Sequence, residues 1–304
     1  MNSQKPFKKT GKFGGKFNKK SNFKKENTEF FSTSPEPQGY SPKFKNKKRG
    51  QQAPLDTSWN KSAKWYDKLV GDAGSEFHTH LIIPGVLKLL FPQKNEKILD
   101  LACGQGFFSV KLAKLGARVT GADMSPRLIT MARDRSRGLP IEYVICDAQD
   151  LAGVPSNQFT AVVCILALQN IESFEKVMQA LNIVTQKKAR FVFVLNHPHF
   201  RIPRHSGWKT DENRKTQLRW VDAYKNDMKI PIQMHPGADP DISTWSFHRP
   251  LESYVKSLAQ NGWVVDAIEE WVSHKESHPG KTANMENRSR NEIPLFMAVR
   301  AHRV

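Results

Sequence analysis

The sequence of 304 residues is poor in cysteine and has no long apolar run. Its three cysteines, Cys103, Cys146 and Cys164, are not spaced as a zinc site, and their odd number argues against a disulfide framework. No run reaches about 18 apolar residues, so we expect no membrane span. The basic N-terminus also lacks the apolar segment of a secretory signal. These absences predict a cytoplasmic protein with reduced thiols and no metal site.

Acidic residues are also scarce, because 47 Lys and Arg stand against 29 Asp and Glu, a net charge of +18. Most of the excess lies in residues 1–50, which hold 13 Lys and 1 Arg against 3 Glu. Lysines there are interleaved irregularly with phenylalanines, without a helix or strand period. We therefore expect residues 1–56 to be a disordered Lys/Phe-rich basic tail and linker. Such a tail either binds RNA through phosphate contacts and base stacking or is only a solubilising extension.

The most informative segment is residues 98–106, where an apolar run containing Asp100 leads into a loop with Gly104 and Gly106 and then a helical pattern. A strand, a tight turn and a helix start form the place where α/β proteins hold nucleotide-like cofactors. Asp123 ends the next strand-like run, where a carboxylate can accept hydrogen bonds from both ribose hydroxyls. The carboxylate of Asp100 would repel a pyrophosphate and suits a cofactor that carries an ammonium or a sulfonium.

The spacing Asp-x-x-x-Gly-x-Gly, with Asp123 and with Asp147 after a third strand, resembles the motifs of class I S-adenosylmethionine-dependent methyltransferases. The overall pattern is similar to the methyltransferase-domain-11 and quinone-biosynthesis methyltransferase group, over about residues 58–304. The resemblance implies S-adenosyl-L-methionine as the cofactor. It also implies a cofactor-binding set at the matching positions, which are Tyr66, Asp100, Ala102, Gly104, Gly106, Asp123, Met124, Asp147, Ala148 and Leu166.

The same resemblance implies a role for each part of this set. Asp100 organises the loop and faces the methionine amino group, while Asp123 holds the ribose hydroxyls. Met124 lies against the adenine. Asp147 accepts the adenine amino group, and Ala148 offers its backbone amide. The two glycines let the backbone approach the ligand, where a side chain would collide with it.

Strand-like runs alternate with helical patterns after the tail, which predicts an α/β fold. Strands are expected at residues 97–102, 118–122, 141–146, 159–168, 189–196, 263–271 and 294–301. Near-continuous apolar strands suit a parallel sheet covered on both faces. Residues 57–304 are therefore predicted to form a Rossmann-like doubly wound seven-stranded sheet. The resemblance implies that strand 7 is antiparallel and lies between strands 5 and 6, and we expect the last two strands to form a hairpin without a helix between them.

A long insert, residues 197–247, separates strand 5 from the following helix and is rich in His, Arg and aromatic residues. Long inserts in compact domains are usually functional or disordered. This one is too aromatic for disorder, so we predict a substrate lid with a short hairpin. The candidate substrate-binding residues are Gln169 and Asn170 after strand 4, and Arg201 and Arg204 in this lid insert.

Four histidines are candidates for the site. His197 and His235 are the candidate catalytic residues, because histidine can take the proton of a hydroxyl acceptor near neutral pH. A structural role for each is the alternative. His78 and His80 precede the first strand and are possible cofactor-pocket residues, with ordinary packing or surface histidines as the favoured alternative. Methyl transfer to an amine or an activated carbon needs no obvious base, because alignment and exclusion of water do most of the work.

Three functions follow from these patterns. The first is an S-adenosylmethionine-dependent methyltransferase acting on a small or medium organic acceptor. The second is an RNA methyltransferase that uses residues 1–50 as an anchor. Enzymes that methylate base amines usually carry Asp/Asn-Pro-Pro-aromatic after strand 4, and residues 168–171 read Leu-Gln-Asn-Ile instead. The third is a non-catalytic RNA-binding protein that retains the cofactor fold.

Overall fold

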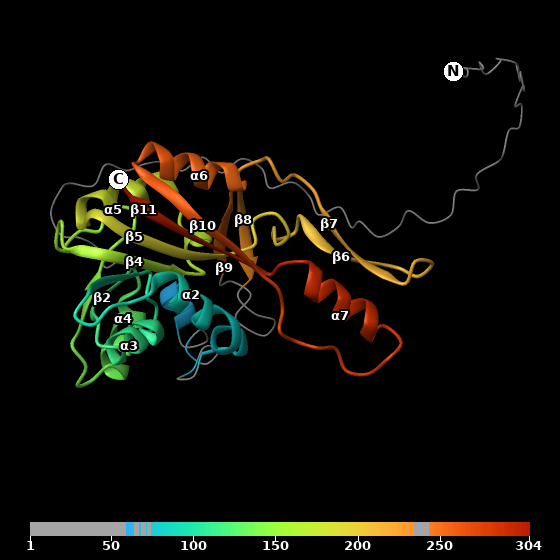
Figure 1. The fold of residues 1–304 in the computed structure, drawn as a ribbon, viewed down its shortest axis with the longest axis horizontal. Helices are drawn as coiled ribbons and strands as arrows, with labels where there is room; N and C mark the ends of the chain where they lie inside the picture. Colours follow the sequence, from blue (N-terminus) through green and yellow to red (C-terminus); the bar gives the residue numbers. More distant parts are fainter. Residues whose placement is uncertain (1–58, 64–66, 68–70, 72–73, 234–242) are drawn as a thin grey trace, which may run out of the picture. The chain divides into compact units, whose positions relative to one another are not determined.

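The computed structural model describes residues 59–63, 67, 71, 74–233 and 243–304 (Figure 1). The tail and linker predicted at residues 1–56 lie outside the described residues, as do Tyr66 and His235. Among the described helices, none is long and apolar enough to cross a membrane.

A seven-stranded sheet in the order β10-β11-β5-β4-β1-β2-β3 carries the fold. Its strands are β1 (Lys97–Leu101), β2 (Arg118–Asp123), β3 (Ile141–Ile145), β4 (Phe159–Ile165), β5 (Thr185–Asn196), β10 (Trp263–Trp271) and β11 (Phe296–Arg303). The first five strands are parallel, and β11 runs antiparallel between β5 and β10. The predicted sheet is confirmed, including the strand that enters between strands 5 and 6.

Helices cover both faces of this sheet (Figure 1). One face carries η1 (His78–Ile82), α2 (Ile83–Leu90), α3 (Phe107–Lys114) and α4 (Pro126–Arg135), and the other carries α5 (Phe174–Val184) and α6 (Leu251–Gln260). Successive side chains of β1 point to opposite faces. Ile98 therefore joins the apolar cluster of α2 and α3, whereas Leu99 joins the cluster of α5 and α6. Burying each such side chain stabilises the fold by about 1.5–3 kcal/mol.

Single residues explain where two of the helices begin. Gly106 precedes α3 with a φ of 76°, in the left-handed region that favours glycine. A β-carbon at this position would also lie 2.5 Å from the hydroxyl oxygen of Tyr143. Ser125 precedes α4, and its hydroxyl accepts a hydrogen bond from the backbone N–H of Leu128 at 3.3 Å. Pro126 takes the first helical position, as the sequence predicts.

The last two strands are not joined as predicted. They pair in antiparallel fashion, but α7 (Ala283–Glu292) lies between them. The expected simple hairpin is therefore wrong. The sequence of α7, ANMENRSRNE, has almost no apolar face from which a helix could be recognised. Ser289 is the buried residue of this helix. The hydroxyl of Ser289 donates to the backbone oxygen of Gln217 at 3.0 Å, so contact with the lid insert supports this polar helix.

The lid insert lies between β5 and α6, where the sequence predicts it. It contains two hairpins rather than one, because β6 (Ser206–Asp211) pairs with β7 (Thr216–Val221), and β8 (Met228–Gln233) pairs with β9 (Ser243–His248). Each pair forms a separate two-stranded sheet. A two-stranded hairpin is marginal alone in water, so these hairpins depend on packing against the rest of the domain.

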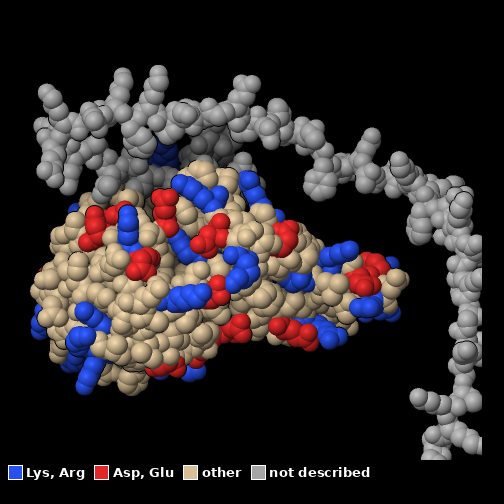
Figure 2. All heavy atoms as spheres, turned by 90° about the horizontal axis from the view of Figure 1, so that it is seen from above, with Lys and Arg blue, Asp and Glu red and all other residues tan. Residues whose placement is uncertain are grey.

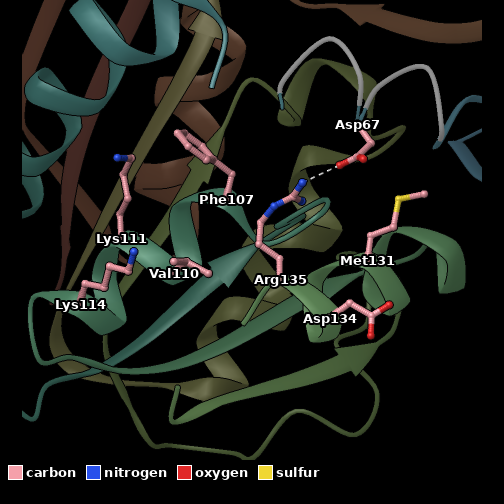
Figure 3. A pocket seen from close by; sticks show the side chains of 8 residues that line it. All are labelled: Asp67, Phe107, Val110, Lys111, Lys114, Met131, Asp134 and Arg135. Atoms are coloured by element: carbon pink, nitrogen blue, oxygen red, sulfur yellow. Dashed lines mark hydrogen bonds and ion pairs between the residues drawn. The ribbon is translucent and has the colours of Figure 1, made fainter. Parts of the chain in front are cut away.

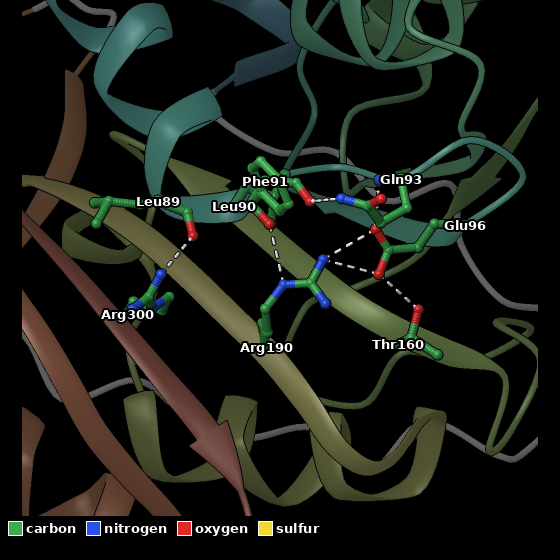
Figure 4. Close-up of polar contacts among 8 residues, drawn as sticks. All are labelled: Leu89, Leu90, Phe91, Gln93, Glu96, Thr160, Arg190 and Arg300. Carbon is green, nitrogen blue, oxygen red and sulfur yellow. Dashed lines mark hydrogen bonds and ion pairs between the residues drawn. The ribbon is translucent and has the colours of Figure 1, made fainter.

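A partly buried ion pair joins four elements near the start of the parallel strands (Figure 4). The guanidinium of Arg190 on β5 donates to both carboxylate oxygens of Glu96 at 2.8 and 2.9 Å. Glu96 precedes β1 and also accepts a hydrogen bond from Thr160 on β4 at 2.9 Å. The Nε of Arg190 donates to the backbone oxygen of Leu90, at the end of α2. We call Arg190, Glu96, Thr160 and Leu90 the Arg190 clamp.

Candidate active site

A cavity opens at the carboxyl ends of β1, β2, β3 and β4, the edge at which open α/β sheets bind ligands. Its walls come from strand ends and the loops that follow them. The lining residues are Trp59, Leu101, Ala102, Gly104, Ala122, Asp123, Met124, Leu128, Cys146, Asp147, Ala148, Ile165, Leu166, Ala167, Asn170 and Ile171. Among these described lining residues two carry carboxylates and none is Lys or Arg. The chemistry therefore favours a ligand with positive charge and apolar surface over a phosphate.

The loop after β1 is bent by left-handed backbone. Ala102 has a φ of 55° and Gly104 a φ of 57°, and both line the cavity. For the alanine this conformation costs roughly 1 kcal/mol or more. Gly106 lies behind the loop, where its φ and its contact with Tyr143 give it a structural reason to be glycine. Of the two predicted glycines, Gly104 is the one at the cavity.

Asp123 is held rigidly at the cavity wall. One carboxylate oxygen accepts a hydrogen bond from the backbone N–H of Gly104 at 2.9 Å, and the other accepts from Ser125 at 2.8 Å. Burial raises the pKa of Asp123, and these two hydrogen bonds oppose the shift. A carboxylate oxygen accepts more than one hydrogen bond, so both oxygens keep capacity for donors of a ligand.

Asp100 lies behind the loop, against a smaller cavity that shares Ala102 and Ile165 with the first. Its buried carboxyl accepts a hydrogen bond from the hydroxyl of Ser109 at 2.6 Å. Burial, with a smaller contribution from the charge of Asp123, raises the pKa of Asp100 to about 7.

Gln105 and His78 line this smaller cavity as well. The side-chain nitrogen of Gln105 is buried and has no hydrogen-bond partner among the described residues. Burial lowers the pKa of His78, and its Nδ1 lies 2.7 Å from the hydroxyl of Ser75. The ring of His78 is therefore partly enclosed beside a candidate ligand cavity, and its role in a cofactor pocket stays a prediction.

Asp147 and Ala148 follow β3, and both line the main cavity. One carboxylate oxygen of Asp147 accepts from the backbone N–H of Gln149 at 2.9 Å. The side-chain oxygen of Gln149 accepts in turn from the backbone N–H of Ser173, the residue before α5. This chain of contacts ties the orientation of the Asp147 carboxylate to the start of a helix.

The segment after β4 forms another wall. Leu166 has a φ of 53° and donates its backbone N–H to Val194 on β5 at 2.8 Å. Leu166 and Asn170 line the main cavity, and Asn170 ends the short helix η2 (Leu168–Asn170). The side-chain amide of Gln169 instead donates to the backbone oxygen of Leu166 at 2.7 Å. The structure thus brings Asn170, but not Gln169, to the lining of the cavity.

His197 is almost fully buried directly after β5. Its Nδ1 accepts from the backbone N–H groups of His199 and Phe200 at 3.2 and 3.4 Å, and its Nε2 lies 2.7 Å from the carboxylate of Glu270. Burial lowers the pKa of His197, and the contact with Glu270 opposes the shift. With both ring nitrogens engaged, the ring organises the start of the lid insert. A catalytic role for His197 stays a prediction.

The two predicted arginines of the lid insert have different surroundings. Arg201 lines a second cavity, together with Phe77 and Trp208. Arg204 is exposed and has a φ of 62°. It lines neither the main cavity, nor the smaller cavity beside it, nor the cavity of Arg201. Arg201 and Arg204 therefore do not line the same cavity.

Sequence reasoning missed Trp59 as a lining residue of the main cavity. It lies in a helical stretch before β1, 38 residues ahead of that strand's first residue, and no local motif accompanies it. The helical pattern indicates burial, but it does not say which side of the sheet the helix covers.

A different cavity lies between α3 and α4 (Figure 3). Its rim mixes charges, with Lys111 and Lys114 on α3 and Asp134 on α4, and Arg135 pairs with Asp67 at 2.9 Å. None of its lining residues belongs to the strand ends that form the main cavity. The predicted site residues therefore do not extend into it.

Neither metal nor thiol chemistry is indicated in the described part of the chain. Within it, no group of three or more His, Cys, Asp or Glu side chains is placed to hold a metal ion. Cys103, Cys146 and Cys164 are free, and burial raises the pKa of each thiol. Thiols of this kind stay protonated and unreactive.

Known sequences match the central part of the chain. Residues 99–193 match the family model of a methyltransferase domain. The ubiquinone biosynthesis O-methyltransferase of Chromobacterium violaceum is 33% identical over 131 residues, 40% of this chain and 53% of that protein. The protein of the same name from Xanthomonas axonopodis pv. citri is 28% identical over 134 residues, 42% of this chain and 54% of that protein. The chain spans about half the length of the curated relatives it matches.

Solved structures match a larger part of the chain. A protein assigned as an S-adenosylmethionine dependent methyltransferase from Listeria monocytogenes is 26% identical with a TM-score of 0.58, covering 73% of this chain and 97% of that one. An S-adenosylmethionine dependent methyltransferase from Mesorhizobium loti shares the fold at 24% identity and a TM-score of 0.59, covering 72% of this chain and 96% of that one. Both structures extend beyond the segment that the family model matches.

Proposed function

We propose that this chain, which carries a class I S-adenosylmethionine-dependent methyltransferase domain, transfers a methyl group from that cofactor to a small or medium organic acceptor. One observation carries the proposal: the cavity at the strand ends has two carboxylates and no Lys or Arg among its described lining residues. S-adenosylmethionine, with an ammonium, a sulfonium and one carboxylate, has a net positive charge, so an acidic lining attracts the molecule as a whole. The pyrophosphate of a dinucleotide would be repelled by the same groups.

The adenosine half of the cofactor fits the part of the cavity between β2 and β3. Asp123 would hold the ribose hydroxyls, which is supported by its fixed carboxylate at the cavity wall. Met124 would lie against the adenine, with Asp147 and Ala148 at its polar edge. Tyr66 remains a proposed cofactor residue outside the described ones.

The methionine half fits toward the smaller cavity. Asp100 would face the ammonium group, which favours the ionised carboxylate. The buried side-chain nitrogen of Gln105 would donate to the methionine carboxylate, and this would satisfy a donor that lacks a partner among the described residues. A buried donor left unsatisfied costs about 1–3 kcal/mol, so such a ligand stabilises the site as well as filling it.

The cofactor supplies, when bound, a methyl group on a positively charged sulfur. The chain has to place an acceptor lone pair in line with that methyl and keep water away. Leu166 and Asn170, at the end of β4, would border the acceptor side. We keep Gln169, Arg201 and Arg204 as acceptor-binding proposals. A hydroxyl acceptor also loses a proton, and His197 and His235 remain the proposed bases for that step.

The substitution Asp123→Ala tests the proposal. We expect S-adenosylmethionine to bind roughly 10- to 100-fold more weakly, because two hydrogen bonds to a charged acceptor are lost. Isothermal titration of the full chain measures the affinity. Asp134→Ala is the matched control, because Asp134 is an exposed carboxylate on α4 that pairs with Arg137. Unchanged affinity in Asp123→Ala would refute the ribose assignment, and no binding by the unaltered chain would refute the proposed function.

The two RNA hypotheses rest on residues 1–50, which lie outside the described residues. Where Figure 2 shows described side chains, basic and acidic groups are interspersed rather than gathered in a field of one sign. No observation on the described domain favours an RNA acceptor. We also propose a cytoplasmic location, which is supported by the three free cysteines.

A further inference from the structure

The cavity that Arg201 lines lies beyond β5, at the same edge of the sheet as the main cavity. Its walls include Phe77 and Leu295, which directly precedes β11, and Trp208 from the first hairpin of the lid insert. Arg201, Lys275, Arg290 and Glu286 bring charge to it. We call this the Arg201 cavity.

Arg201 has a charge that its described surroundings do not neutralise. Its Nε is buried and has no hydrogen-bond partner, and its guanidinium makes no ion pair within the described part of the chain. The guanidinium carbon lies 5.6 Å from the centre of the Trp208 ring, and the guanidinium of Arg219 lies 5.1 Å from the same ring. Burial, and then repulsion from Arg219, lowers the pKa of Arg201 to about 10. The side chain is therefore still a cation at neutral pH.

The other cations around the cavity have partners. Lys275 pairs with Glu76 at 2.5 Å. Arg290 pairs with Glu286 at 3.7 Å, along one face of α7.

Glu286 is occupied by its own neighbours as well, because it accepts hydrogen bonds from the hydroxyls of Ser277 and Thr282. Arg219 donates to the backbone oxygen of Phe200 at 2.7 Å and to the hydroxyl of Ser206 at 2.8 Å. Arg201 is thus the cation in this group for which the described residues supply no acceptor.

A half-buried guanidinium without an acceptor is unfavourable, because the desolvation cost of the charge is not offset by a hydrogen bond or an ion pair. A carboxylate satisfies it best, because its two oxygens match the planar fork of donors. Phe77 and Trp208 add aromatic surface beside this charge. The cavity therefore suits an anion attached to a flat or apolar body.

The position of the Arg201 cavity limits the length of a molecule that could reach both this cavity and the end of β4. Strands β4, β5 and β11 are neighbours in the sheet, and their ends at this edge are Ile165, Asn196 and Phe296. Neighbouring strands lie about 4.8 Å apart, and Phe296 is two residues further along the sheet than Ile165, so the end of β11 is roughly 12 Å from the end of β4. One molecule could place its reacting atom at β4 and an anionic group at the Arg201 cavity only if these groups were separated by about that distance.

We propose that the methyl acceptor is an elongated aryl carboxylic acid whose carboxylate is bound by Arg201. This inference rests on the proposed function, because it takes the cavity at β1 to β4 as the cofactor site. It specifies the class of acceptor, which the comparisons leave open. Trp208 and Phe77 bind the apolar part, and the carboxylate orients the opposite end of the molecule toward β4.

The experiment compares the binding of a carboxylic acid with that of its neutral amide analogue. 4-Hydroxycinnamate and 4-hydroxycinnamamide have the same shape and differ in charge at one end. Isothermal titration of the full chain measures both, with and without S-adenosylhomocysteine, so binding is observed whether or not the methyl is transferred. We expect the acid to bind at least about tenfold more tightly than the amide.

The Arg201→Gln variant should remove this preference and leave the affinity for S-adenosylhomocysteine unchanged. Arg214→Gln is the matched control, because Arg214 is an exposed arginine of the lid insert, between β6 and β7. Thermal unfolding of both variants checks that they fold.

Equal affinity of the unaltered chain for acid and amide, or no binding of either, would overturn the proposal without any variant. So would an acid preference that survives in a folded Arg201→Gln protein. If S-adenosylhomocysteine fails to bind, the proposed function fails, while the comparison of acid and amide without it still decides whether Arg201 binds carboxylates.

Discussion

Asp100 is a carboxyl group whose charge depends on its enclosure. It is buried behind the loop after β1, and its pKa is raised to about 7 by that burial and by the nearby Asp123. Near neutral pH the ligand-free group is therefore partly protonated. A cation placed beside it favours the carboxylate, so binding of such a ligand releases a proton.

We predict that S-adenosylmethionine binds about tenfold more tightly at pH 7.5 than at pH 6. The direction follows because the cation prefers the ionised carboxyl, and that form becomes the major one as the pH rises through the raised pKa of Asp100. The interval ends at pH 7.5 because an α-amino group itself loses its proton at about 7.7–8.0. Isothermal titration at each pH, in two buffers with different ionisation enthalpies, gives both the affinity and the protons released.

The control is Asp100→Asn, which keeps the size of the side chain and removes its titration. It should bind more weakly at pH 7.5 and show a nearly flat dependence between pH 6 and 7.5. The same rise in affinity in this variant would assign the effect to another group.

The residues that could be predicted from the sequence are those whose position depends on short-range spacing. Asp123 ends β2 and Asp147 lies two residues after β3, so the strand direction alone places them at one edge of the sheet. Partners distant in the sequence determine the other outcomes. His197 is engaged by Glu270, 73 positions away, and the surroundings of Arg201 depend on the pairing of β6 with β7.

The Arg190 clamp joins elements rather than residues of one element. The side chains of Arg190 and Glu96 are 21% and 7% exposed, and they connect α2, β1, β4 and β5. Such a pair contributes little compared with apolar residues of the same size, but removing one partner leaves the other charge buried and unpaired.

We predict that Arg190→Ala lowers the free energy of unfolding by about 3 kcal/mol, near the lower end for buried pairs because Arg190 is partly exposed. Urea denaturation measures the change. Arg118→Ala, at an exposed position that begins β2, should change it by less than about 0.5 kcal/mol. The double variant Glu96→Gln with Arg190→Met should be more stable than Arg190→Ala, and equal losses would contradict the account of an unpaired charge.

Elements with a periodic apolar pattern were predictable, and α7 was not. The strands of the parallel sheet read as nearly continuous apolar runs because both faces are covered, so the sequence indicates them directly. In α7, Ser289 is buried against β7, and that contact has no counterpart in the local pattern of hydrophobicity. The fold of the sheet could thus be predicted, but the number of hairpins in the lid insert and the helix that packs on it could not.

At the scale of the whole molecule, the described apolar core begins at Ala63. We predict that removing residues 1–54 changes the melting temperature by less than about 2 °C, since the composition of this segment predicts disorder and a disordered segment contributes little to the unfolding enthalpy. The affinity for S-adenosylmethionine should also be unchanged. Calorimetry and titration of the shortened chain measure both. A large loss of stability or affinity would show that the tail belongs to the folded domain.

The hydrogen bond from Ser289 on α7 to the backbone of Gln217 on β7 joins two insertions that leave the sheet at different points. One insertion follows β5, and the other precedes β11. We expect either segment, transferred alone into a related enzyme, to lose the contact between α7 and β7, so both segments have to be transferred together. We therefore expect the segment after β5 and the segment before β11 to be grafted or diversified as one unit.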